Sequence, residues 1–173
     1  MNDFFATHRR LPGFARNLGA SLILAAATPG MALASSPAPD APAGCTGPAS
    51  GTWIRIVAEG VRNSDGHIAV TLYPDNPSRF LVAKGSLYVT FIKATQGTTS
   101  GCLFLPKPGV WVVALYHDEN DNRKIDRSAI GLPTEGYGFS NNPPTLLGLP
   151  SFRSVRLNAA RSGLTSHIQM KYP

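Results

Sequence analysis

Apolar and polar residues alternate along most of the chain after residue 50, which is the pattern of strands that bury one face. In residues 52–58, Ile54 and Ile56 share the face opposite to Trp53. Residues 110–116 (VWVVALY) are instead almost continuously apolar, as expected of a strand in the middle of a sheet. The pattern predicts seven strands, over residues 52–58, 67–73, 86–94, 98–105, 110–116, 152–157 and 164–172.

Strands at this spacing, without a helical pattern, predict an all-β domain built as an antiparallel seven-stranded β-sandwich, with a small β-barrel as the alternative. The 17 Gly and 15 Pro argue against a helical bundle, and 15% charged residues argue against disorder or a coiled coil. In the connection after the second strand, Phe80, Leu81 and Val82 are expected to cover one end of the core.

The first 34 residues have the pattern of a signal peptide. A basic region precedes the apolar run 18–27, and Ala32-Leu33-Ala34 suits cleavage after Ala34. Ten apolar residues are too few to cross about 30 Å of hydrocarbon, so no transmembrane anchor is expected after cleavage. The Pro- and Ala-rich residues 35–50 are predicted to be a linker, and 51–173 the domain. The protein is therefore expected in the periplasm or outside the cell.

Cysteine usage agrees with export, and the charge pattern argues against a nucleic-acid partner. Cys45 and Cys102 are the two cysteines of the chain, and we expect them to form a disulfide, with two buried free thiols as the alternative. The 16 Lys and Arg outnumber the 10 Asp and Glu, but they are scattered singly. Nucleic acid is therefore not an expected partner, whereas nonspecific contact with an anionic envelope surface remains open.

The chemically informative residues lie in the long loop 117–150, which begins directly after the most apolar strand. In the first part of this loop, oxygen-bearing side chains occupy positions 118, 120, 122 and 126. The backbone carbonyl of residue 124 would supply the oxygen at the position between 122 and 126. Calcium takes six to eight oxygen ligands from curled loops of this kind. The candidate calcium ligands are Asp118, Asn120, Asn122, Lys124 through its carbonyl, and Asp126.

Two departures weaken the calcium interpretation. Arg123 occupies the position where a calcium loop usually has Gly, and Ala129 occupies that of the bidentate Glu. Arg123, Lys124 and Arg127 also oppose a divalent cation, so any affinity should be weak. The alternative is an Asp- and Asn-rich turn that satisfies its own backbone.

Several motifs in a fixed order resemble a known family. HDENDNRKID, GLPTEGYGFSNN and LPSF follow a PxPG turn and a VWVVAL strand, and the resemblance covers about residues 45–172. In these motifs the chain is similar to the bacterial secreted family named domain of unknown function 2141. The resemblance implies a small exported β-sandwich of the transthyretin-like or carboxypeptidase regulatory type, and no known activity. Arg123 stands where that family usually has Gly.

The second part of the long loop brings aromatic rings close to amides and a carboxylate. Such a combination stacks on and hydrogen-bonds a glycan or a peptide, so the loop is a candidate binding rim for a glycan, a peptide or an envelope protein. The alternative is that Tyr137 and Phe139 plug the open end of the sandwich. The candidate rim residues are His117, Glu135, Tyr137, Phe139, Asn141 and Asn142.

Catalysis is not indicated by the sequence. His117 adjoins Asp118 and Glu119, so a metal-assisted hydrolase can be drawn, but no HExxH, GxSxG or phosphate-binding Gly loop is present. No cofactor besides calcium is indicated. The sequence therefore predicts an exported noncatalytic module, binding or accessory at the cell envelope, with a purely structural domain or an unrecognised hydrolase as alternatives.

Overall fold

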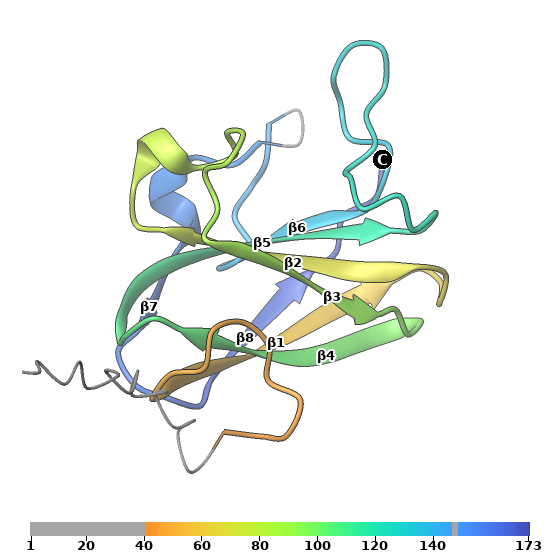
Figure 1. Cartoon of the computed structure of the whole chain (residues 1–173). Helices are drawn as coiled ribbons and strands as arrows, with labels where there is room; N and C mark the ends of the chain where they lie inside the picture. The colour runs from red at the N-terminus through yellow and green to blue at the C-terminus, as the bar shows by residue number, and fades with distance from the viewer. Residues whose placement is uncertain (1–40, 147–148) are drawn as a thin grey trace, which may run out of the picture. The chain divides into compact units, whose positions relative to one another are not determined.

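The computed structural model describes residues 41–146 and 149–173 (Figure 1). The predicted signal peptide 1–34 and the first part of the predicted linker lie outside these residues. Within the described part, no helix is long and apolar enough to cross a membrane. The elements are β1 (Thr52–Val61), β2 (His67–Pro74), the 3₁₀ helix η1 (Pro77–Arg79), β3 (Tyr88–Lys93), β4 (Gly97–Leu105), β5 (Gly109–Asp118), β6 (Tyr137–Phe139), the 3₁₀ helix η2 (Phe152–Val155), β7 (Arg156–Ala159) and β8 (Leu164–Gln169).

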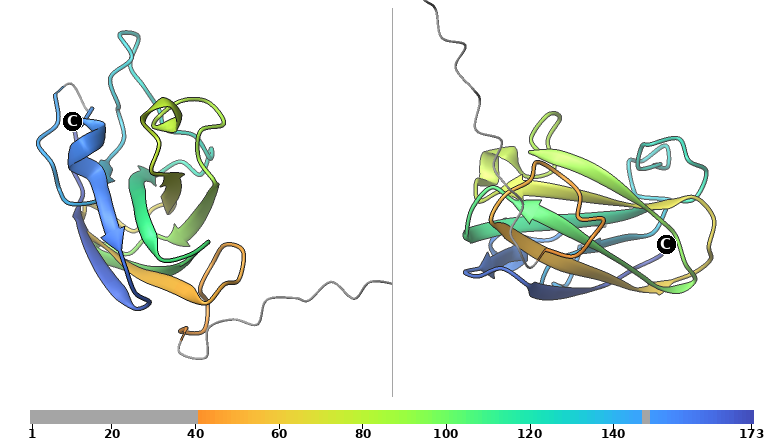
Figure 2. Two further views of the ribbon diagram at one scale, coloured as in Figure 1. Left: turned by 90° about the vertical axis from the view of Figure 1, so that its left-hand side faces the viewer. Right: turned by 60° about the horizontal axis from the view of Figure 1, so that its bottom comes forward.

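The strands form two sheets that face each other, which confirms the predicted all-β sandwich over the barrel alternative (Figures 1 and 2). One sheet has the order β4-β1-β8. The other has the order β3-β2-β5-β6, and β7 also pairs with β5. The described residues contain eight strands where seven were predicted, because β6 lies within the long loop. The β1–β8 pair is parallel, whereas the other strand pairs are antiparallel.

The core lies between the two sheets, and alternation along each strand supplies it. In β1, Ile54, Ile56 and Ala58 are buried while Arg55 is exposed, as the sequence pattern predicted. Burial of these aliphatic side chains is the main stabilising term of the sandwich. The other large, fully buried side chains of this core are Ile68, Val70, Leu72, Leu103, Leu105, Val113 and Ile168.

The outer face of the five-stranded sheet carries a second apolar cluster. β2 and β5 are buried on both faces, which explains their continuous apolar sequences. The outward residues are covered by η1, η2 and the segments around them. The cluster consists of Tyr73, Val112, Ala114, Phe139 and Val155, with Phe80, Tyr137 and Phe152 packed against it.

The predicted strand 152–157 is wrong in its first half. Residues Phe152–Val155 form the 3₁₀ helix η2, and the strand β7 starts only at Arg156. Phe152 and Val155 are three residues apart, so one 3₁₀ turn directs both toward the same side. Both belong to the outer cluster, and this packing replaces the strand pairing that alternation had indicated.

The turn between β1 and β2 forms as predicted and depends on one glycine. Gly66 has a φ of 57°, and a Cβ at this position would lie 1.8 Å from the carbonyl oxygen of Asp118. No side chain fits there, since backbone cannot yield as a flexible side chain does. The turn therefore lies directly against the end of β5, where the long loop begins.

Candidate functional site

The acidic loop, residues 118–126, starts at the end of β5 with a buried carboxylate. The Oδ1 of Asp118 accepts the backbone N–H of Asn122 at 3.0 Å, and its Oδ2 accepts that of Arg123 at 2.8 Å. Asp118 is completely buried. These bonds curl the chain back onto the strand end, with Asp121 and Arg123 at φ values of 56° and 62°. Arg123 thus adopts the left-handed conformation that glycine favours at this position of a calcium loop.

Three of the remaining candidate calcium ligands, Asn120, Asn122 and Asp126, contact one another. The Nδ2 of Asn120 donates to Oδ2 of Asp126 at 2.8 Å, and the Nδ2 of Asn122 donates to Oδ1 of Asp126 at 2.9 Å. The Oδ1 of Asn122 accepts the backbone N–H of Lys124 at 2.8 Å. Across residues 41–146 and 149–173, no three His, Cys, Asp or Glu side chains gather as a metal-binding group. Asn120, Asn122 and Asp126 therefore do come together, within a turn whose polar groups bond each other.

Glu135 closes the acidic loop from its far side. Its Oε2 accepts the backbone N–H of Asp126 at 3.0 Å, and its Oε1 accepts that of Glu119 at 3.3 Å. Burial raises the pKa of Glu135, and the carboxylates of Asp126 and Asp118 act in the same direction. The carboxylate therefore joins the two ends of the loop, so this candidate rim residue also belongs to the acidic loop.

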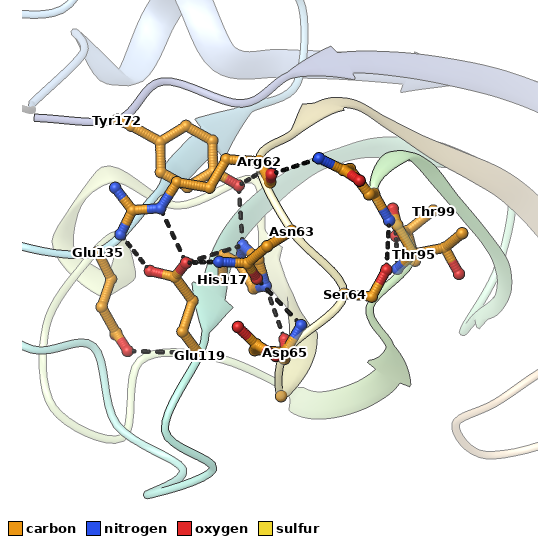
Figure 3. Close-up of polar contacts among 12 residues, drawn as sticks. Arg62, Asn63, Ser64, Asp65, Thr95, Thr99, His117, Glu119, Glu135 and Tyr172 are labelled. Carbon is orange, nitrogen blue, oxygen red and sulfur yellow. Dashed lines mark hydrogen bonds and ion pairs between the residues drawn. The ribbon is translucent and has the colours of Figure 1, made fainter.

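His117 lies in a polar cluster at one end of the sandwich (Figure 3). Its Nε2 is 2.9 Å from the carbonyl oxygen of Asp65, and its Nδ1 is 2.8 Å from the hydroxyl of Tyr172. Because a carbonyl only accepts, Nε2 carries a proton and donates it to Asp65, while Nδ1 and the hydroxyl of Tyr172 share a hydrogen bond. His117 is fully buried and both ring nitrogens are bonded within the protein. This arrangement holds the turn after β1 and the C-terminal segment against β5.

Arg62 and Glu119 complete this cluster (Figure 3). The guanidinium of Arg62 forms a bidentate pair with Glu119, with Nε 2.8 Å from Oε1, and Asn63 donates to the same Oε1 at 2.7 Å. The hydrogen bond from Arg62, more than the one from Asn63, lowers the pKa of Glu119. Sequence reasoning missed Arg62 and Tyr172. The backbone N–H of Arg62 donates to the hydroxyl of Tyr172, and a contact between residues 110 positions apart leaves no local pattern in the sequence.

The two asparagines of the predicted rim bond backbone groups of neighbouring segments. Asn141 donates from Nδ2 to the carbonyl oxygen of Arg156 at 2.8 Å. Asn142 donates from Nδ2 to the carbonyl oxygen of His167 at 3.0 Å, and its Oδ1 accepts the N–H of Gln169 at 2.8 Å. The carboxamide of Asn142 therefore occupies the edge of β8 as a neighbouring strand would.

Tyr137 and Phe139 lie instead on β6 and line a pocket on the outer face of the five-stranded sheet. Its volume is about 270 Å³. The sheet forms its floor, and three loops around residues 81–83, 125–133 and 149 form its walls. Leu81 and Val82, predicted to cover the core, are exposed at this pocket instead. The lining comprises Thr71, Tyr73, Leu81, Val82, Ala83, Ala114, Leu115, Tyr116, Ile125, Arg127, Pro133, Tyr137, Phe139 and Leu149.

The pocket is largely apolar, with a few groups that can hydrogen-bond. Burial raises the pKa of Tyr116 to about 12, so its hydroxyl keeps its proton and can donate. Among the described residues, the hydroxyls of Tyr73 and Tyr116 have no hydrogen-bond partner, and Arg127 is the one charged side chain of the lining. Aromatic walls with a small number of polar groups are typical of ligand sites. Of the six candidate rim residues, only Tyr137 and Phe139 line this pocket.

The predicted disulfide is present and ties the start of the described chain to the sheet edge. Cys45 and Cys102 are bonded, with their Cα atoms 4.6 Å apart. Next to the bridge, the N–H of Thr46 bonds the carbonyl oxygen of Cys102 at 3.1 Å, and the carbonyl of Thr46 accepts from Phe104 at 2.9 Å. The segment around Cys45 therefore pairs along β4.

Comparison with known proteins identifies a family. No curated protein and no solved structure matches the chain. A family model described as "Uncharacterized protein conserved in bacteria (DUF2141)" matches residues 56–166, which is more than half of the chain. This range includes β1 from its middle, the acidic loop, β6 and the start of β8. The match agrees with the resemblance seen in the sequence motifs, and the chain belongs to the DUF2141 family.

Proposed function

We propose that this chain is an exported, noncatalytic binding module of the cell envelope, and that the pocket on the outer face of the five-stranded sheet is its ligand site. The observation that carries the proposal is the pocket itself, an apolar hollow of about 270 Å³ floored by a sheet and walled by three loops. For scale, an engineered apolar cavity of about 150 Å³ binds benzene. The pocket therefore has room for one ring or a short aliphatic group.

Its lining favours an apolar ligand group over a glycan. Tyr73, Tyr137 and Phe139 offer ring faces and edges, and Ala114 leaves space at the floor between them. The hydroxyls of Tyr73 and Tyr116 can orient one polar atom of the ligand. An apolar side chain of a peptide or envelope protein fits this chemistry, as does a small ring with one hydroxyl.

The state of His117 supports a noncatalytic role. A general base must reach the proton that it abstracts and have a free nitrogen to take it. His117 is fully buried, and its two ring nitrogens already bond Asp65 and Tyr172. Its role is therefore to join three segments of the fold, and the hydrolase alternative loses its most plausible base.

The Cys45–Cys102 disulfide supports the proposed export, because such bridges persist mainly in oxidising compartments. The signal-peptide pattern of residues 1–34 points the same way. Location in the periplasm or outside the cell is therefore part of the proposal. Fusion of residues 1–34 to a reporter that is active only after export would test it.

Binding of a small apolar probe tests the pocket. We expect para-cresol and cyclohexanol to shift the methyl NMR signals of Leu81 and Val82 in a saturable manner. Ala114→Leu, which fills the floor, should abolish the shifts, and Tyr137→Ala should weaken them. Ala129→Leu, the same change on an exposed loop residue outside the lining, should leave them unchanged. If neither probe shifts these signals, or if the Ala114 and Ala129 variants behave alike, the purely structural domain replaces the proposal.

We also propose that residues 118–126 bind calcium weakly. Asn120, Asn122 and Asp126 already contact one another, and rotation of the two amides would turn their oxygens toward a shared cation. Calcium should then raise the unfolding temperature relative to EDTA. Asp126→Asn should remove this shift, whereas Asp65→Asn, the same charge change in the β1–β2 turn, should keep it. An unfolding temperature that calcium leaves unchanged in the wild type would refute the site.

A further inference from the structure

Three loops stand on the same side of the five-stranded sheet and expose aliphatic side chains at their tips. They are residues 76–86, 127–134 and 143–146 with 149–155, and they rise from the outer face of the sheet in both Figures 1 and 2. Residues from all three line the pocket described above, so the three loops surround one space. We call their tips the three-loop face.

Exposed aliphatic residues are concentrated on this face. Ile130 is 81% exposed in the turn that the Gly131 N–H closes onto the carbonyl of Ser128, and Leu146 is 79% exposed where it pairs with Leu149. Val82 is 50% exposed and Leu149 is 53% exposed. With Leu81, these make five of the seven large apolar residues that are exposed in the described part of the chain. Exposed apolar groups gathered on one side of a molecule mark an interaction surface.

The charge of the three loops has one sign. Residues 76–86, 127–134 and 143–155 contain no Asp or Glu, but they contain Arg79, Lys84, Arg127 and Arg153. Lys84, Arg127 and Arg153 are exposed. The face therefore combines aliphatic tips with basic side chains.

Three carboxylates in and next to the acidic loop, which lies beside the face, are already hydrogen-bonded within the protein. The carboxylates of Asp118 and Glu135 each accept two backbone N–H groups, and Asp126 accepts the amides of Asn120 and Asn122. A partner that approaches the tips thus meets the cations of the loops first. A surface of negative charge with an apolar interior is complementary to this arrangement.

We infer that the three-loop face docks on an anionic lipid bilayer, with the aliphatic tips inserted at the boundary between headgroups and acyl chains. This inference goes beyond the proposed pocket ligand, although Leu81, Val82, Arg127 and Leu149 belong both to the face and to the pocket lining. Apolar insertion and electrostatic attraction to anionic lipids are the two terms that govern interfacial binding. Lys84 is exposed two residues from Val82, and the guanidinium of Arg127 bonds the carbonyl oxygen of Gly131, next to Ile130, at 2.9 Å. Both long side chains can extend from there to lipid phosphates. Three separate tips fit a fluid surface, because each enters it on its own.

Sedimentation with lipid vesicles tests the inference. The protein should sediment with vesicles of phosphatidylglycerol and phosphatidylethanolamine, and much less with vesicles of phosphatidylcholine. The double variant Val82→Ser/Ile130→Ser should weaken binding on the order of tenfold. Leu87→Ser is the matched control, because Leu87 is 40% exposed but lines a different hollow, with Pro48 and Phe104. It should bind as the wild type does.

The charge term is tested in the same assay. Lys84→Gln and Arg127→Gln should each weaken binding about fivefold, and added salt should weaken it further. Arg161→Gln, an exposed arginine in the turn between β7 and β8, is the control for net charge and should have little effect. Thermal unfolding of each variant verifies the fold. Equal sedimentation with both vesicle types, no sedimentation with either, or losses no larger than those of the two controls would overturn the inference and favour a protein partner.

Discussion

Asn142→Ala gives the sharpest test of how the long loop is held to the sandwich. The side chain of Asn142 forms two hydrogen bonds with the edge of β8, to His167 O at 3.0 Å and from Gln169 N at 2.8 Å. A net value of about 1 kcal/mol for each bond gives about 2 kcal/mol. Asn142 also has a φ of 49°, where alanine is less favourable than asparagine by up to about 1 kcal/mol.

The expected loss in the free energy of unfolding is therefore about 2 to 3 kcal/mol. Urea unfolding followed by circular dichroism measures it, and the slope against urea should stay unchanged if only the native contacts are lost. Asn142→Gly separates the two contributions, because glycine relieves the backbone strain but also lacks the carboxamide. It should lose less than the alanine variant and still fall well below the wild type.

Asn158→Ala serves as the matched control, since Asn158 is exposed on β7. It should change the stability by no more than about 0.5 kcal/mol. The freed edge of β8 should also make the Asn142 variants more prone to aggregation. A loss below 0.5 kcal/mol for Asn142→Ala would show that the carboxamide does not hold the edge, and would return Asn142 to the candidate ligand-binding residues.

Three other changes have defined outcomes. Replacement of Cys45 and Cys102 by Ser should lower the free energy of unfolding by about 4 kcal/mol, because the bridge spans 57 residues; urea unfolding measures this. Glu119→Gln should lower the free energy of unfolding by about 1 kcal/mol at neutral pH. The Arg62 pair lowers the pKa of Glu119 from 4.5, so the difference in stability between variant and wild type should vanish as the pH falls below 4.5 through the lowered pKa. A difference in stability that stays constant with pH would contradict the role of the charge. Arg123→Gly should raise the stability by up to about 1 kcal/mol by removing a left-handed arginine, and a lower unfolding temperature would contradict this.

Strands and turns that are determined by residues adjacent in the sequence could be predicted from it. The burial of Ile54 and Ile56 in β1 follows from alternation, and the turn at Gly66 follows from its turn residues. The short strand β6 could not be found this way, because three residues show no periodicity and pair with β5 only once the loop returns to it. The parallel pairing of β8 with β1 likewise depends on the whole chain path.

The candidate site could be predicted only where its residues are neighbours in the sequence. The run from Asp118 to Asp126 indicated a curled acidic loop, and the structure has such a loop. Glu135, which closes it, was assigned to the binding rim, because its distance from the run hides the two hydrogen bonds that it makes. Whether the loop binds calcium stays a prediction. His117 also looked like a rim residue, yet its environment comes from Asp65 and Tyr172, which lie far away in sequence.

The sequence contains one indication of the pocket, which is that two strands are apolar on both faces and do not alternate. A strand of a two-layer sandwich needs apolar residues on its inner face only, so an outer face that is also apolar requires a second cover. The runs HIAVTLY and VWVVALY are apolar on both faces, and the covers are the loops that carry η1 and η2. Because loops seal a sheet less completely than a second sheet does, a gap beside Ala114 remains open between them. The same loops also carry the exposed aliphatic tips, so one departure from simple alternation accounts for both the proposed ligand site and the proposed docking face.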